Sequence, residues 1–195
     1  MISEKIWVLL ADKKEVPDYN ELKKKINCYL TGIGLFESYY NFLSLIKNGE
    51  KKPQKVILLG TAGSVKKEDI FSLCISNEFG LLPSSSVDVP EFIRQRYKTK
   101  AALENKKLSK KYSYKNPLIL SSFGVSVKDE KKHLEYFWEN MEAASISYVC
   151  LKEKIPFSAF LCCTNKIGPN GRTQWKQNYK KAGELLVGAL DNLVL

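Results

Sequence analysis

Residues 56–63 read Val-Ile-Leu-Leu-Gly-Thr-Ala-Gly, and this run predicts the fold class. An uninterrupted apolar run such as Val56–Leu59 is typical of a strand buried on both faces of a sheet. The glycine-rich tail Gly60–Gly63 predicts a sharp turn directly after that strand. A sheet buried on both faces needs helices on both sides, so the run indicates a layered α/β protein.

The rest of the chain repeats the alternation of strand and helix. Further strands are predicted at Ile6–Leu10, Cys28–Thr31, Ile70–Ser76, Leu118–Ser122 and Pro156–Cys163, and helices at Glu37–Ile46, Leu134–Lys152 and Tyr179–Leu195. No internal repeat or linker divides the sequence, so a single domain is expected over residues 1–195, around a largely parallel or mixed sheet.

Small and polar residues follow several of the predicted strands. They are Ala11, Gly32, Gly60–Gly63, Gly124 and Asn165. In open α/β sheets, ligands bind beyond the carboxyl ends of the strands. These residues are therefore expected to gather at one rim of the sheet.

The formal net charge is +10, and nine of the 22 residues in the segment Arg94–Lys115 are Lys or Arg. Interleaved tyrosines in that segment would suit a groove for nucleic acid. A solvated basic surface explains the same composition, and no nucleic-acid partner is expected.

The five cysteines show no CxxC spacing and lie mostly in apolar stretches, which favours a reducing compartment. The one histidine, His133, lies in a charged run, so neither a Cys–His nucleophile nor a zinc site is expected. The apolar runs are too short to span a bilayer, and the N-terminus lacks a signal-peptide pattern. We expect a cytoplasmic protein with no metal, cofactor or membrane partner.

Five stretches together resemble the purine nucleoside phosphorylase and methylthioadenosine nucleosidase superfamily. They are Ala11–Glu15, Thr31–Gly34, Gly60–Gly63, Asn140–Ala144 with its Met-Glu pair, and Ile155–Phe157 leading to Thr164–Lys166. The resemblance covers most of the chain and implies the single-domain, three-layer fold of nucleoside phosphorylases, with a central mixed sheet flanked by helices. It also implies a homodimer or larger homo-oligomer.

The C-terminal part narrows the resemblance to the futalosine hydrolases. Tyr148–Leu151, Thr164–Gly168, Arg172 and Trp175 are similar to that family, and Gly124–Val127 is similar to its Gly-x-Thr-Val stretch. The resemblance implies release of hypoxanthine from the 6-oxopurine nucleoside futalosine during menaquinone biosynthesis.

Asn165 is the candidate for the leaving base. Its amide has two donors and one acceptor, so the NH2 group can donate to O6 of a 6-oxopurine while the carbonyl accepts from a protonated N7. An aspartate would suit a 6-amino group instead, and the resemblance implies this same division between the families.

Glu142 is the candidate for the ribose, because one carboxylate can accept hydrogen bonds from two vicinal hydroxyls. Met141 would supply an apolar surface under the sugar. Glu15 is the candidate general base for water, since partial burial raises the pKa of a carboxyl group toward working pH. With Asn165, Glu15 forms the predicted catalytic pair.

The remaining candidates bind substrate. Thr61, Ala62 and Gly63 belong to the glycine-rich turn, whose amides are suited to a polar ligand or the water. The resemblance implies that Trp175 closes over the 5′ substituent and that Ile33 lines the same pocket, and Gly34 and Val125 complete the predicted set. Lys166 or Arg172 offers a positive charge for an anionic substituent.

Two departures from the family leave alternatives open. Leu161 stands where the family usually has an arginine near the water, and Lys128 where futalosine hydrolases often have Asn. The three arginines of the chain lie outside the glycine loops, which favours water over phosphate as nucleophile. An adenine-releasing nucleosidase, a nucleoside phosphorylase, a divergent non-catalytic member and a basic nucleic-acid-binding module remain as alternative hypotheses.

Overall fold

The computed structural model of the chain describes residues 5–49, 52–82, 96–103, 114–122 and 136–194. Its strands are β1 (Ile6–Leu10), β2 (Asn27–Leu30), β3 (Lys55–Ser64), β4 (Leu73–Ser76), β5 (Glu78–Leu81), β6 (Tyr97–Lys98), β7 (Tyr114–Lys115), β8 (Leu118–Ser121), β9 (Phe137–Glu139) and β10 (Phe157–Lys166). Its helices are α1 (Tyr19–Lys25), α2 (Leu35–Asn48), α3 (Ala143–Lys152) and α4 (Gly171–Val194), with short 3-10 turns η1 (Lys13–Glu15) and η2 (Lys67–Asp69). Gly124, Val125, Lys128 and His133 lie outside the described residues.

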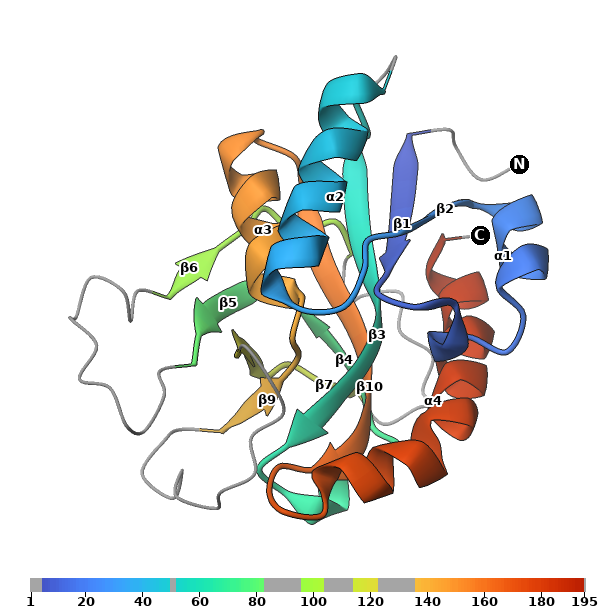
Figure 1. The fold of residues 1–195 in the computed structure, drawn as a ribbon, viewed down its shortest axis with the longest axis vertical. Coiled ribbons are helices and arrows are strands. Elements are labelled where there is room, and N and C mark those ends of the chain that lie inside the picture. Colours follow the sequence, from blue (N-terminus) through green and yellow to red (C-terminus); the bar gives the residue numbers. More distant parts are fainter. Residues whose placement is uncertain (1–4, 50–51, 83–95, 104–113, 123–135, 195) are drawn as a thin grey trace.

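The described strands form one mixed sheet centred on β3 and β10, the two longest strands (Figure 1). β10 runs parallel to β3 along most of its length. The other edge of β3 has two partners: β1 pairs in parallel with residues 55–58, and β9 pairs antiparallel with Gly63 and Ser64. Residues 60–62 therefore lie at a gap between β1 and β9, and this gap positions the site.

Alternate side chains of the central strands pack against different helices. Trp7, Leu9, Val56 and Leu58 belong to the core under α2 and α3. Val8, Leu10, Ile57 and Leu59 belong to the core under α1 and α4. Figure 1 shows these helix pairs on opposite sides of the sheet. The expected three-layer α/β architecture with a central mixed sheet is confirmed.

The predicted helix Leu134–Lys152 is wrong in its first half. Phe137–Glu139 forms strand β9, and α3 begins only at Ala143. The Asn140 side chain explains the break, because its Oδ1 accepts hydrogen bonds from the backbone N–H groups of Glu142 and Ala143 at 3.0 and 2.8 Å. Such a side-chain acceptor satisfies N–H groups that a helix start leaves without partners.

Other boundaries differ from the prediction by less. β4 begins at Leu73 and not at Ile70, because Phe71 has a φ of 68°, which is incompatible with a strand. Residues 19–25, for which no helix was predicted, form α1. Its first turn is capped by the Asp18 carboxylate, which accepts from Glu21 N–H. α4 begins at Gly171, well before the predicted Tyr179.

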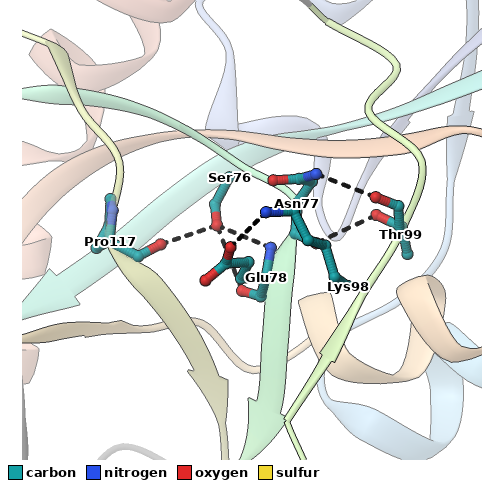
Figure 2. A network of polar contacts seen from close by, with 6 residues as sticks. All are labelled: Ser76, Asn77, Glu78, Lys98, Thr99 and Pro117. Carbon is teal, nitrogen blue, oxygen red and sulfur yellow. Dashed lines mark hydrogen bonds and ion pairs between the residues drawn. The ribbon is translucent and has the colours of Figure 1, made fainter.

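The polar network of Figure 2 joins β4, near one end of the strand order, to β5 and β6 at the other end. The buried Ser76 hydroxyl donates to the carbonyl of Pro117 at 2.8 Å, which links the end of β4 to the segment before β8. Asn77 Nδ2 donates to the Thr99 carbonyl at 3.0 Å, and Lys98 forms an exposed ion pair with Glu78. These contacts support β5 and β8, and β8 in turn pairs with β9 next to the site.

Candidate active site

The gap beside residues 60–62 of β3 is filled by side chains from two separate segments. The backbone N–H of Thr61 donates to Glu15 Oε1 at 3.2 Å, and the backbone carbonyl of Thr61 accepts from Asn140 Nδ2 at 3.0 Å. Both main-chain groups of Thr61 are thus bonded to polar side chains in place of a neighbouring strand. The predicted rim is therefore a break in the sheet, and Gly60–Gly63 lie inside β3 and not in a turn after it.

Glu15 is only 8% exposed, although its neighbours Lys13 and Lys14 are exposed. η1 turns its carboxylate back toward the end of β1, where Oε2 accepts from Ala11 N–H at 3.0 Å. Oε1 also accepts from the Thr61 hydroxyl at 3.4 Å. A side chain at position 60 would clash, since a Cβ built on Gly60 lies 2.8 Å from Glu15 Oε1.

Glu142 is the second buried carboxylate of the site and is 5% exposed. It lies at the start of α3, and its Oε1 accepts from the backbone N–H of Gly34 at 2.8 Å. Gly34 has a φ of 87° and precedes α2, so this bond joins the N-terminal ends of two helices. The Ser38 and Ser145 hydroxyls, 2.6 Å apart, link the same two helix ends one turn further on.

Burial raises the pKa of both carboxyl groups. The pKa of Glu15 rises to about 8, first because burial disfavours the charged form and second because of the negative charge of Glu142. The pKa of Glu142 rises to about 7, mainly through burial, while the Gly34 N–H opposes the rise. Two carboxyl groups that titrate near neutrality and affect one another are suited to proton transfer.

Asn165 lies within β10, directly beside Gly63 of β3, after an irregularity in the strand register at Cys163. Its Oδ1 accepts from the Thr164 hydroxyl at 2.9 Å. Its Nδ2 donates to the Lys166 carbonyl at 3.2 Å and lies 2.8 Å from a Cβ built on Gly63. The NH2 end of the Asn165 amide and Ile167 therefore fill the space above Gly63, a close approach that a larger residue at position 63 would block.

Trp175 of α4 contacts the gap at Thr61. Its indole Nε1 donates to the Thr61 hydroxyl at 3.0 Å, and its ring stacks on Tyr179 with centroids 5.0 Å apart. Thr61 thereby connects Trp175 with Glu15, and the sequence did not predict this connection. A hollow of about 560 Å³ lies next to this cluster, between Lys13–Asn20 and Tyr179–Glu184. The buried acceptors and the amide lie outside its lining, so we place the site at the gap and not in the hollow.

Other predicted residues fit less directly. Met141 is half-buried, and its Cε lies 3.8 Å from a Cβ built on Gly34, which places it beside Glu142 as expected. Ile33 is 55% exposed and does not line a closed pocket in this chain alone. The Ala62 side chain packs into the core under α2 and α3, so only its backbone is near the site.

Leu161, the residue in place of the family's arginine, is fully buried in the core under α2 and α3 and lies beside Gly60. Arg172 is exposed at the start of α4. Sequence reasoning named Asn140 only as part of a motif, and it did not single out Glu139 or the close approach at Gly60. For Glu139 and Asn140 the available signal was that two polar residues stand together, a pattern that also suits the predicted helix Leu134–Lys152.

Over the described ranges, no group of His, Cys, Asp and Glu side chains is arranged to bind a metal ion. All five cysteines are buried free thiols. None of the helices in the described part of the chain has both the length and the apolar character needed to cross a bilayer.

Comparisons with known proteins identify the fold. No family model matches the sequence, and no curated protein matches it. Among solved structures, a futalosine hydrolase mutant of Helicobacter pylori strain 26695 superposes with a TM-score of 0.81 at 19% identity, covering 97% of this chain and 98% of that one. The methylthioadenosine/S-adenosylhomocysteine nucleosidase of Neisseria meningitidis gives 0.80 at 17% identity, covering 97% and 98%. That of Helicobacter pylori gives 0.79 at 18%, covering 95% of each chain. The chain thus has the nucleoside phosphorylase-like fold.

Proposed function

We propose that the chain is an N-glycosidase that hydrolyses a 6-oxopurine nucleoside, with futalosine as the favoured substrate. The observation that carries the proposal is the gap in the sheet, where two buried carboxyl groups from distant segments affect one another electrostatically, near an amide packed against Gly63. The fold shared with nucleosidases supports the same reaction. Burial of two carboxyl groups costs folding free energy, so a cluster of this composition favours a functional role.

The base is bound by Asn165 above Gly63. Glycosidic cleavage leaves negative charge on the departing purine, so a donor at O6 and an acceptor for a protonated N7 both lower the barrier. An amide NH2 carries two hydrogens, so beside its bond to the Lys166 carbonyl it can donate to O6. This polarity supports a 6-oxopurine and distinguishes the proposal from the adenine-releasing nucleosidases, which the fold comparison supports equally.

The ribose is bound by Glu142, with Met141 beside it as an apolar surface. A carboxylate at the joined starts of α2 and α3 accepts from sugar hydroxyls while the helix ends stabilise its charge.

The segment that begins α2 exposes apolar surface, from Ile33, Phe36, Tyr39 and Tyr40. An exposed apolar surface of this kind suits association between copies, in line with the expected homodimer or larger oligomer.

Water is activated by Glu15. A carboxylate with a pKa of about 8 is a strong enough base to remove a proton from water that attacks an oxocarbenium-like sugar. Because Leu161 is apolar and cannot assist, activation of the water depends on Glu15 and its contacts with Thr61. Phosphate is not required, since no arginine of the chain lies in the segments that build the gap. We place the reaction in the reducing cytoplasm, in line with the free thiols.

The test is base release from three nucleosides: futalosine, inosine and methylthioadenosine, with the released base identified by chromatography. The reaction is run with and without phosphate, and with and without a chelator. We expect hypoxanthine from futalosine, no dependence on phosphate or chelator, and slower or no release of adenine. Adenine as the dominant product would favour the methylthioadenosine nucleosidase alternative. Ribose 1-phosphate would favour a phosphorylase. Absence of any release, with binding to nucleic acid that weakens steeply with salt, would favour the basic module.

A further inference from the structure

Thr61 lies between Trp175 and Glu15 and bonds both of them through one side-chain oxygen; we call these three residues the relay. The indole Nε1 of Trp175 donates to Thr61 Oγ1 at 3.0 Å, and the Thr61 hydroxyl donates to Glu15 Oε1 at 3.4 Å. An indole N–H can only donate, whereas a hydroxyl accepts and donates at the same time. The direction of the relay is therefore fixed, from the indole through the hydroxyl to the carboxylate.

Burial makes the direction of these bonds matter. Thr61 and Glu15 are each 8% exposed, and Trp175 is half-buried, so water competes little for their polar atoms. Hydrogen bonds in series strengthen one another in such surroundings. A hydroxyl hydrogen rotates to suit its partners, and acceptance from the indole restricts it to directions away from Trp175, which include that of Glu15 Oε1.

The indole is held in place by contacts on either side of Trp175 in α4. Gln174 Oε1 accepts from the backbone N–H of Lys166 at 2.8 Å. Asn178 Nδ2 donates to the backbone carbonyl of Thr164 at 2.8 Å. Both contacts anchor this part of α4 to the end of β10, the strand that pairs with β3. The position of the indole N–H beside Thr61 is therefore set by the packing of α4 on the sheet.

We propose that Trp175 is a positioning residue for Glu15: its indole N–H orients the Thr61 hydroxyl, which in turn stabilises the ionised form of the Glu15 carboxylate. The inference rests on the proposed function, in which Glu15 is the base, and adds a residue that sets how readily this base ionises. A hydrogen bond donated to a carboxylate favours its charged form. The Thr61 backbone N–H already lowers the pKa of Glu15 against the effect of burial, and the hydroxyl acts on the same oxygen.

The other charged groups around Glu15 do not depend on the indole. They are Glu142 at the start of α3, Asp12, Lys13 and Lys14 beside Glu15 in the chain, and Tyr179, Lys180 and Glu184 of α4, which line the hollow next to η1. A Trp175→Phe substitution retains all of them and an aromatic ring, and it removes the N–H. A change in the ionisation of Glu15 in this variant is thus attributable to the relay.

The test measures kcat/KM against pH for the wild type, Trp175→Phe, Thr61→Val and the double variant. We expect the midpoint of the rise with pH to move up by about 0.5–1 pH unit in Trp175→Phe and at least as far in Thr61→Val, because loss of a long hydrogen bond raises the pKa of a carboxyl group by about that amount. In the Thr61→Val background, Trp175→Phe is expected to cause no further shift. Trp7→Phe, which removes an indole from the core under α2 and α3, is the matched control and is expected to keep the wild-type midpoint.

The relay is also measurable without turnover, from urea unfolding at pH 5 and pH 10. Trp7 and Trp138 remain in Trp175→Phe and report unfolding by fluorescence. A further rise in the folded-state pKa of Glu15 makes ionisation more destabilising. We therefore expect the unfolding equilibrium constant to increase from pH 5 to pH 10 about three- to tenfold more in Trp175→Phe than in the wild type.

A Trp175→Phe variant that changes KM while the pH midpoint stays in place overturns the inference, since Trp175 then only packs against the substrate. An equal shift in both Thr61 backgrounds overturns it as well, because the effect then bypasses the hydroxyl. Failure of the proposed function is a separate result, in which the wild type releases no base from any nucleoside. The unfolding measurement then still tests the relay, and a pH dependence identical to that of the wild type overturns it.

Discussion

Glu15→Gln is expected to stabilise the protein at alkaline pH, although Glu15 is proposed as the catalytic base. The pKa of Glu15 is about 8 in the folded chain against 4.5 for an ordinary glutamate. Because the folded-state pKa is raised, ionisation of Glu15 destabilises the folded chain. The free energy of unfolding therefore falls as pH rises from about 4.5 through about 8. Each pKa unit corresponds to about 1.4 kcal/mol, which gives a cost of roughly 5 kcal/mol above pH 8 and roughly 3 kcal/mol at pH 7.

Glutamine avoids this cost but loses part of the hydrogen bonding. The carboxylate of Glu15 accepts from Ala11 N–H and from both Thr61 donors. A glutamine amide presents NH2 to one of these positions, which costs about 1–3 kcal/mol. At pH 5 the Glu15 carboxyl group is itself protonated and resembles the amide, so we expect little difference in stability there, and we expect Glu15→Gln to be more stable by about 2–4 kcal/mol at pH 9.

The assay is urea unfolding at pH 5, 7 and 9, followed by tryptophan fluorescence, with the free energies compared at each pH. Glu21→Gln is the matched control, because Glu21 is an exposed glutamate paired with Lys24 on the surface of α1. Its effect is expected to stay small at all three pH values. A Glu15→Gln variant that is destabilised by the same amount at pH 5 and pH 9 would refute the reasoning, since Glu15 would then ionise in the folded chain without cost.

Four further outcomes are expected. The wild-type kcat/KM rises with pH up to about pH 8, because Glu15 acts as a base only when ionised; a rate that falls over pH 6–8 contradicts this. Glu142→Gln loses about 2–4 kcal/mol of transition-state stabilisation, and a 2′-deoxy substrate loses less in this variant than in the wild type; additive penalties exclude contact with that hydroxyl. Asn165→Asp moves the kcat/KM ratio of inosine-type to adenosine-type substrates at least ~10-fold toward adenine; equal slowing of both means that Asn165 does not recognise the base. Gly63→Ala weakens base binding at least ~10-fold, because its Cβ would lie 2.8 Å from Asn165 Nδ2; unchanged hypoxanthine affinity in a titration locates the base elsewhere.

Several features of the chain were readable from local sequence. β1, the start of β3 and α2 were predicted close to their observed bounds, because a strand buried on both faces must be apolar throughout and a half-buried helix must repeat every 3.6 residues. The nucleoside phosphorylase-like architecture followed from the alternation of these elements and from the resemblance. Glu15 and Glu142 were named as candidates; Glu15 lies at the edge of β3, and Glu142 lies close enough to affect its pKa.

Other features depended on contacts between distant segments. The pattern of apolar and polar residues in 134–152 suits a helix as well as a strand. Only the pairing of Glu139 with Gly63 and the capping by Asn140 separate this segment into β9 and α3. The burial that raises the pKa of Glu15 arises because β3 continues past β1, so Glu15 and not a strand bonds Thr61 on the edge opposite β10. The placement of Glu139 and Asn165 on either side of Gly63 depends on the register of three strands. Local sequence determines which residues are apolar, polar or flexible, whereas register and burial depend on packing energies summed over the whole sheet, and these brought the carboxyl groups and the amide to the central strands.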